Sequence, residues 1–300
     1  MRTANKDVRR SQACGWQAKV RRLSCFAVAW MLAASLLEPL AQARPYPTGE
    51  AIGSLKPRAA QAFDLYVAKV DAKNKTTLAG AFLWVDELDK GERTAAYANL
   101  KDGQVEIRRE KPEVGNPSGG LLHDWEGIVF IPGAKLADVL GVLQDYNHHA
   151  TYYAPDVEQS KIESRNGDHF QVFMRFKRHN VVTVVLNTQQ DIQYSRDSAT
   201  RAHSRSSATR IAQVENAGTS SEKEMTPGDD DGYLWRMETW WRVEERDGGV
   251  YVQNEVLSLT RDIPTGLGWL IEPFITNIPK ETLDFTLQAT RKAVLAKTGR

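Results

Sequence analysis

Apolar and polar residues alternate with a period of two along most of the chain after residue 121, and this alternation predicts a region dominated by β-strands. The dipeptides Asn166-Gly167 and Asp247-Gly248 separate consecutive alternating runs, and both are typical of two-residue hairpin turns. Strands joined by such short turns run antiparallel. We expect strands over residues 125–131, 157–165, 168–178, 181–194, 201–214, 233–243 and 251–260.

One face of the predicted hairpin over 233–260 combines aromatic, flexible and small polar side chains. A two-residue turn sets three cross-strand pairs on that face: Trp241 with Asn254, Thr239 with Val256, and Met237 with Ser258. Alternation adds Trp235 to the same face. Such a mixture is typical of the lining of a small-molecule pocket, and an ordinary hydrophobic core is the alternative interpretation.

The run over 201–214 carries small residues on one face and basic residues on the other. The small residues are Ala202, Ser204, Ser206 and Ala208, and the residues alternating with them are Arg201, His203 and Arg205. One interpretation is a strand whose small inner face leaves room for a bound molecule. The alternative is an edge strand whose basic side chains discourage pairing with another chain.

Apolar residues spaced by three and four positions predict helices over 57–75, 134–144 and 280–297. We expect the last helix to begin at Pro279, because proline suits the first turn of a helix. Its predicted apolar face consists of Leu283, Leu287, Thr290 and Val294.

Residues 1–43 have the three parts of a secretory signal peptide. Seven basic residues and one acidic residue precede an apolar run over 23–37, and Ala41-Gln42-Ala43 fits an A-x-A cleavage site. The apolar run is shorter than the roughly 20 residues that a membrane-spanning helix needs, and an uncleaved anchor is the alternative. We therefore expect an exported protein, periplasmic or secreted.

Cleavage after Ala43 would change the chemistry available to the chain. The remaining 257 residues contain no cysteine, because Cys14 and Cys25 both lie in the leader. This excludes a cysteine nucleophile and a cysteine-ligated metal. Loss of the leader takes the formal net charge from +1 to −4, so we expect neither a nucleic-acid partner nor stable membrane insertion of the mature chain.

Composition divides the chain after the leader into three parts. Residues 44–110 contain one predicted helix and a short predicted strand at 104–110, and form an N-terminal extension. Residues 111–120 hold two prolines and three glycines and are typical of a linker. The strand-rich region over 121–300 is the expected main domain.

No motif for phosphate, dinucleotide or zinc binding and no nucleophile elbow appears in the chain, so we expect no cofactor and no metal. His148-His149 lacks a third ligand beyond Asp145 and Asp156, and a metal site there is disfavoured. Five side chains could supply acid–base chemistry next to a ligand: Arg175, Glu255, Asp262, Tyr152 and Tyr153. The two-residue turn places Glu255 opposite Trp240 on the more polar strand face, which favours solvent exposure.

The predicted order of elements resembles the helix-grip fold of the START-like (SRPBCC) superfamily, which includes START lipid-binding domains, Bet v 1-like proteins, and polyketide cyclase and coenzyme Q-binding relatives. The resemblance covers residues 121–297, and is carried by DYNHHATYYAPDVEQSKI (145–162) and by the last strand, connector and helix (257–294). It implies an α+β fold in which a curved antiparallel sheet wraps a long C-terminal helix, with a ligand cavity between them. The N-terminal extension lies outside this resemblance.

The resemblance implies binding of a lipid, a sterol-like molecule or another hydrophobic small molecule, without a cofactor and without an assigned catalytic residue. The connector 265–279 and the loop 146–155 are the candidate movable covers. The expected ligand-lining residues are Trp235, Met237, Thr239, Trp241, Asn254, Val256, Phe173, Arg175, Tyr152, Tyr153, Trp269, Phe274 and Leu287.

Two other functions compete with carriage of a hydrophobic molecule. A cyclase, dehydratase or hydrolase-like enzyme would need a titratable group in the same cavity. A protein that docks a partner through residues 44–110 would expose an apolar patch on the 57–75 helix.

Overall fold

The computed structural model describes residues 53–112, 115–179, 183–262 and 268–299, and in the last segment it describes side chains from residue 278 onward. The expected leader and the side chains of Trp269 and Phe274 therefore lie outside the described residues. Among the helices in the described ranges, none is both long and apolar enough to cross a membrane.

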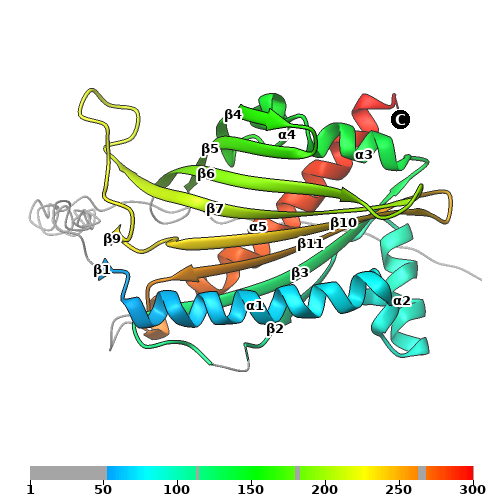
Figure 1. Ribbon diagram of the computed structural model, residues 1–300, viewed down its shortest axis with the longest axis horizontal. Helices are drawn as coiled ribbons and strands as arrows, with labels where there is room; N and C mark the ends of the chain where they lie inside the picture. Colours follow the sequence, from blue (N-terminus) through cyan, green and yellow to red (C-terminus); the bar gives the residue numbers. More distant parts are fainter. Residues whose placement is uncertain (1–52, 113–114, 180–182, 263–267, 300) are drawn as a thin grey trace, which may run out of the picture. The chain divides into compact units, whose positions relative to one another are not determined.

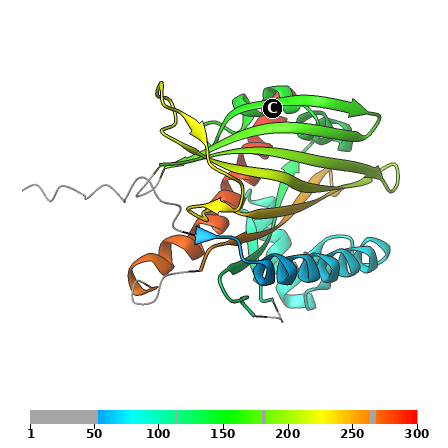
Figure 2. The ribbon, with the colours of Figure 1, turned by 60° about the vertical axis from the view of Figure 1, so that its left-hand side comes forward.

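The strands form one antiparallel sheet that curves around the C-terminal helix (Figures 1 and 2). In spatial order its strands are β2 (Glu106–Glu110), β3 (Leu121–Pro132), β11 (Gly249–Thr260), β10 (Arg236–Arg246), β7 (Arg201–Glu215), β6 (Thr183–Arg196), β5 (His169–His179) and β4 (Val157–Asn166). The short strand β8 (Lys223–Glu224) also pairs with β7, and β1 (Gly53–Ser54) and β9 (Asp229–Asp230) form a separate two-stranded sheet.

The β10–β11 hairpin has the register expected from the sequence. Asp247 and Gly248 have φ angles of 57° and 75°, the left-handed backbone that a tight two-residue hairpin turn requires. Arg246 consequently pairs with Gly249, and the three predicted cross-strand pairs on the aromatic face are all formed. The pattern of alternation therefore predicted this part of the sheet correctly.

Helices cover both faces of the sheet. They are α1 (Pro57–Ala79), the 3-10 helix η1 (Trp84–Glu87), α2 (Lys90–Lys101), α3 (Leu136–Leu143), the 3-10 helix η2 (Tyr146–His148), α4 (His149–Tyr152) and α5 (Gly268–Lys297). Figure 1 shows α1 in front of the sheet and α5 behind it. We call the face toward α5 the inner face and the face toward α1 the outer face.

The C-terminal helix is longer than the sequence pattern predicted. It begins at Gly268 rather than at Pro279, so most of the expected connector 265–279 is helical. A proline inside a helix removes only one backbone hydrogen bond, and no glycine between Gly268 and Gly299 interrupts the rest of the helix. The helix therefore continues through the proline that was expected to start it.

The N-terminal extension packs on the main sheet. Its strand β2 pairs with β3, from Glu106 opposite Ile128 to Glu110 opposite Asp124. On the outer face, Phe63 and Val70 of α1 belong to a buried cluster with residues of β3, β10 and β11. Phe63 is 2% exposed, so this apolar side of α1 is packed against the sheet, whereas Leu65 on the same helix is 60% exposed.

A glycine on β3 lets α5 approach the inner face closely. A methyl group added at Gly127 would lie 2.7 Å from Cδ1 of Leu287 and 3.1 Å from Cδ2 of Leu283. Both leucines are fully or almost fully buried, and Val294 continues the same helix face into the main core. Leu287 therefore lies against the sheet as expected, held there by the missing side chain at position 127.

We predict that Gly127→Ala lowers the stability of the fold by about 1–3 kcal/mol, because Leu283 and Leu287 must shift to admit the methyl group. Gly141→Ala on α3 is the matched control, since nothing lies within 4 Å of its added methyl group and alanine favours helix. Thermal unfolding followed by circular dichroism measures both. Equal melting temperatures for the two variants would contradict this account of the α5 contact.

Candidate functional site

The inner face of the sheet is a grid of side chains set by the strand register. Trp241 on β10 lies between Asn254 on β11 and Ser204 on β7. Thr239 lies between Val256 and Ser206 in the next row. Met237, Thr239, Trp241 and Val256 are partly buried on this face.

The small face of β7 is an inner face. β7 lies between β10 and β6, so the alternative of an edge strand is wrong. Ala202 belongs to the core under α5, and Ser204 and Ser206 alternate with it in the same direction. The basic residues point outward, where Arg201 pairs with Glu244 and Arg205 pairs with Asp71.

Helix α5 contacts the two flanks of the curved sheet more closely than its middle strands. One side of the helix packs on β3 and β11 through Leu283 and Leu287. On its other side the helix contacts the opposite flank of the sheet, where Ala289 of α5 clusters with Tyr153 and with Val157 of β4. The small residues of β7 lie between these two lines of contact.

Three buried polar atoms on the β3–β11 part of the inner face have no hydrogen-bond partner among the described residues: Asn254 Oδ1, Trp125 Nε1 and His123 Nδ1. Asn254 is 3% exposed and His123 is 1% exposed. Buried polar groups in folded proteins are nearly always hydrogen-bonded to protein, water or a ligand, so these three atoms are available to a partner from outside the chain.

The tyrosines near α3, α4 and β6 have internal partners instead. The hydroxyls of Tyr146 and Tyr194 are 2.7 Å apart, and Tyr194 donates to the carbonyl of Leu143 at 3.1 Å. Tyr153 is 3.0 Å from the hydroxyl of Thr290 on α5, and burial raises its pKa to about 12. Tyr152 donates to Asp145 at 2.7 Å. Both loop tyrosines predicted to line the ligand therefore lie against α5: Tyr153 at Thr290, and Tyr152 with its ring 5.6 Å from Nζ of Lys297.

Three predicted lining residues do not face α5. Trp235 sits at a bend before β10, where alternation no longer applies, and it packs in the outer-face cluster with Nε1 donating to Asp230 at 2.9 Å. Phe173 and Arg175 lie on the opposite side of β5 from Val172 and Met174, which belong to the inner core.

Arg175 lines an open, mostly polar groove of about 660 Å³ on the outside of β4 and β5. Its guanidinium donates to both carboxylate oxygens of Glu222, at 3.0 and 2.9 Å, and to Glu158 at 3.1 Å. These two carboxylates satisfy the charge of Arg175, so the groove offers no free cation from this residue.

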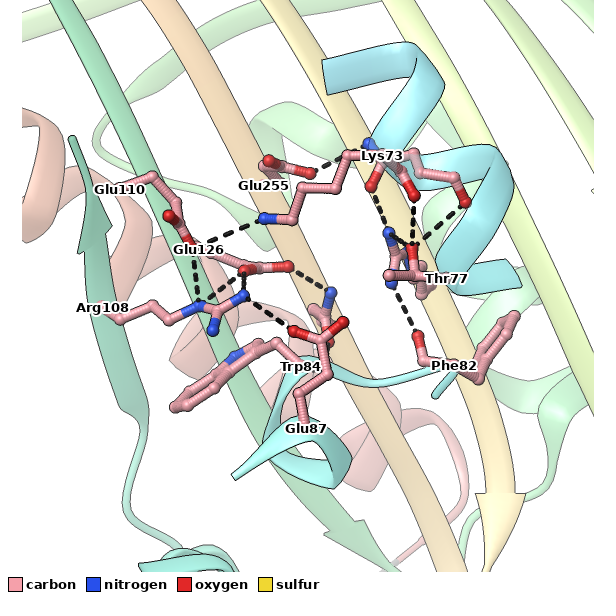
Figure 3. Close-up of polar contacts among 12 residues, drawn as sticks. Lys73, Thr77, Phe82, Trp84, Glu87, Arg108, Glu110, Glu126 and Glu255 are labelled. Carbon is pink, nitrogen blue, oxygen red and sulfur yellow. Dashed lines mark hydrogen bonds and ion pairs between the residues drawn. The ribbon is translucent and has the colours of Figure 1, made fainter. Parts of the chain in front are cut away.

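Glu255 is buried, contrary to the solvent exposure that its polar strand face favoured. It is 1% exposed, because α1 covers the outer face above it (Figure 3). It accepts a hydrogen bond from Nδ2 of Asn74 at 3.0 Å and lies directly across from Glu126 in the sheet. The polar residues of α1 were the sequence signal for this coverage, since they match the polar strand face.

Charged groups around Glu255 form a buried network between α1, β2 and the sheet (Figure 3). Glu126 pairs with Arg108 at 2.6 Å and accepts from Gln253 at 2.6 Å. Arg242 donates to the carbonyl of Phe82 at 2.8 Å, to Thr77 at 2.7 Å and to Asn74. The network attaches the N-terminal helices to the sheet.

Burial and the neighbouring carboxylates raise the pKa of Glu255 to about 8. Burial also raises the pKa of Asp124 to about 6, although the Tyr66 hydroxyl donates to it at 2.8 Å. Glu255 therefore holds a proton at neutral pH and lies away from the inner face. Among the described residues, no group of three or more histidine, cysteine, aspartate or glutamate side chains is arranged to hold a metal ion.

We predict that Glu255 makes the folded state more stable as the pH falls from about 8 to about 6.5; below that range the buried neutral His123 and His149 oppose this gain, because burial lowers the pKa of each to about 4. The pKa of Glu255 rises from 4.5 to about 8 on folding, so folding takes up a proton between these pH values. Above pH 8 the carboxylate is ionised in both states, and the folded protein then bears the full free-energy cost of burying the charge. Glu255→Gln should stabilise the protein above pH 8 and flatten this pH dependence.

Urea unfolding at several pH values measures this effect, and Glu163→Gln, at an exposed carboxyl on β4, is the control. An unchanged pH profile for Glu255→Gln would show that Glu255 is ionised in the folded protein.

Comparison with solved structures gives distant matches, and no family model and no curated protein matches the chain. A STAR-related lipid transfer protein from Xanthomonas axonopodis is 18% identical, with 63% of this chain and 93% of that chain covered and a TM-score of 0.43. Human STARD10 is 8% identical, with 71% and 82% covered and a TM-score of 0.40. The Zhui aromatase/cyclase from Streptomyces sp. R1128 is 14% identical, with 60% and 94% covered and a TM-score of 0.36.

Identities and TM-scores this low say nothing about a ligand. The topology of this chain is informative by itself: β3 leads into α3 and α4, the strands from β4 to β11 then complete a curved antiparallel sheet, and a long C-terminal helix lies on its inner face. This is the helix-grip arrangement, and the chain therefore shares the fold of the START-like superfamily.

Proposed function

We propose that the protein binds a hydrophobic small molecule, of lipid or sterol-like character, between α5 and the middle strands of the sheet. The observation that carries this proposal is the composition of the inner face: aromatic and aliphatic side chains surround small residues and buried polar atoms that lack partners. Pockets for small molecules combine a mainly apolar lining with a few polar groups in this way.

The rows around Trp241 show why this face suits a ligand. Its neighbours across the strands are Asn254 and Ser204, which are much smaller than the indole. A large side chain beside small ones is difficult to pack without voids, and voids are costly in a folded protein. A bound apolar molecule would supply the missing contacts.

Carriage is favoured over catalysis because two of the titratable candidates lie away from this face. Arg175 is on the outside of β5, and Glu255 is under α1. The one buried histidine in the β3 part of the inner face, His123, has a pKa lowered to about 4 by burial and by the charge of Arg109, which keeps it neutral. A mainly apolar face whose buried histidine is uncharged is suited to binding.

Export by the leader remains part of this proposal. The basic segment, the apolar run and the A-x-A site over 1–43 support delivery of the mature chain to the periplasm or the medium. A protein in such a compartment would carry its apolar ligand through water.

We predict that Ser204→Leu abolishes ligand binding and leaves the folded state intact, because the added side chain occupies the space under α5. A packed inner face would instead lose about 1–3 kcal/mol from overpacking. Ser195→Leu is the control, since Ser195 pairs with His203 on the outer side.

Binding is measured as the rise in melting temperature with fatty acids, phospholipids and sterols, and by native mass spectrometry of co-purified molecules. Ligand at one hundred times its dissociation constant adds about 2.7 kcal/mol of stability. Absence of any shift and of any co-purified molecule in the unsubstituted protein would contradict carriage.

We predict that the exported protein begins at Arg44. Intact-mass measurement of protein from a periplasmic fraction checks this, and retention of residues 1–43 in a membrane fraction would instead support the uncleaved anchor.

A further inference from the structure

The β2 side of the inner face carries a cation without an anion. Arg109 on β2 lies opposite Trp125 on β3, and its guanidinium carbon is 5.6 Å from the centroid of the indole ring. In the described part of the chain Arg109 forms no ion pair, whereas Arg108, the preceding residue on β2, pairs with Glu126. Arg109 is exposed at the edge of the sheet, so its charge is accessible from solvent.

The ring beneath Arg109 presents a second unsatisfied donor. Trp125 Nε1 is buried and has no acceptor among the described residues. An indole nitrogen can only donate, and a guanidinium can only donate. Two donor groups, one buried and one exposed, therefore lie side by side on β2 and β3.

His123 adds a third polar group to this end. It lies two residues from Trp125 on the same strand face, with Nε2 3.0 Å from the hydroxyl of Thr260 and Nδ1 unpaired. Burial, and after it the charge of Arg109, lowers the pKa of His123, in agreement with the place of Arg109 opposite Trp125.

No carboxylate of β3 pairs with Arg109, Trp125 or His123. Asp124 and Glu126 alternate with His123 and Trp125 and point to the outer face, where Tyr66 and Arg108 bind them. The polar end of the inner face is therefore positive and rich in donors, whereas the rows near Trp241 are mainly apolar.

We propose, on the basis of the proposed function, that the bound molecule has an anionic, oxygen-rich head group, a carboxylate or a phosphate monoester, held by Arg109 and Trp125 and lying beside His123. Its apolar body extends from there along the middle strands toward Trp241. An arginine donates to carboxylate and phosphate oxygens with charge-assisted hydrogen bonds, which are stronger than those to neutral acceptors.

The test compares three ligands with the same hydrocarbon chain: hexadecanoic acid, hexadecyl phosphate and hexadecan-1-ol. Equilibrium binding of each labelled ligand to the full chain gives the dissociation constants. The two anions should bind at least tenfold more tightly than the alcohol, as expected for hydrogen bonds to a charged group. The tighter of the two anions identifies the head group as carboxylate or phosphate.

Two substitutions locate the effect. Arg109→Gln should weaken binding of the anions about tenfold and change binding of the alcohol by less than threefold. Trp125→Phe keeps an aromatic ring and removes the N–H donor, so it should also weaken the anions selectively. Lys111→Gln, which removes an exposed positive charge two residues from Arg109, should leave all three affinities unchanged.

The outcomes separate this inference from the proposed function. Equal affinity for the anions and the alcohol, or equal losses in Arg109→Gln and Lys111→Gln, would overturn the head-group assignment and leave carriage standing. Failure of all three ligands, and of every other apolar ligand tested, to bind the unsubstituted protein would overturn both.

Discussion

The contact between α5 and the backbone of β3 at Gly127 is the constraint on which the inner face depends. Without a side chain at that position, Leu283 and Leu287 settle directly on the sheet and fix one flank of the helix. Ala289, near Tyr153, fixes the other flank. The middle strands face the helix with small residues, so the two flanking contacts set how far the helix lies from these strands.

The outer face is built on a different principle. Buried carboxylates and guanidinium groups there meet polar residues of α1, β2 and the loop after α1. A buried ion pair is weak support for stability, because removing charges from water costs about as much as the pair returns. The network instead fixes where α1 lies on the sheet, because Asn74 must donate to Glu255 and accept from Arg242 at the same time.

Local patterns in the sequence predicted the sheet well and its coverage poorly. The hairpin at Asp247-Gly248 and the alternation around it were sufficient for the register of β10 and β11. Alternation cannot say which helix covers a face, so the surroundings of Glu255 required tertiary structure. Trp235 was misplaced because a bend precedes β10, and the start of α5 because a proline lies inside it.

The pairing of β2 with β3 has a consequence for where this chain can be divided. The segment over 111–120 resembles a linker, yet the elements on both sides of it belong to one hydrogen-bonded sheet and one shared core. In a chain that starts at residue 121, Leu257 and Leu259 would lose the cover of α1 and become exposed to solvent. Glu126 on β3 would also lose its ion pair with Arg108 on β2. The N-terminal helices are therefore part of the minimal folding unit.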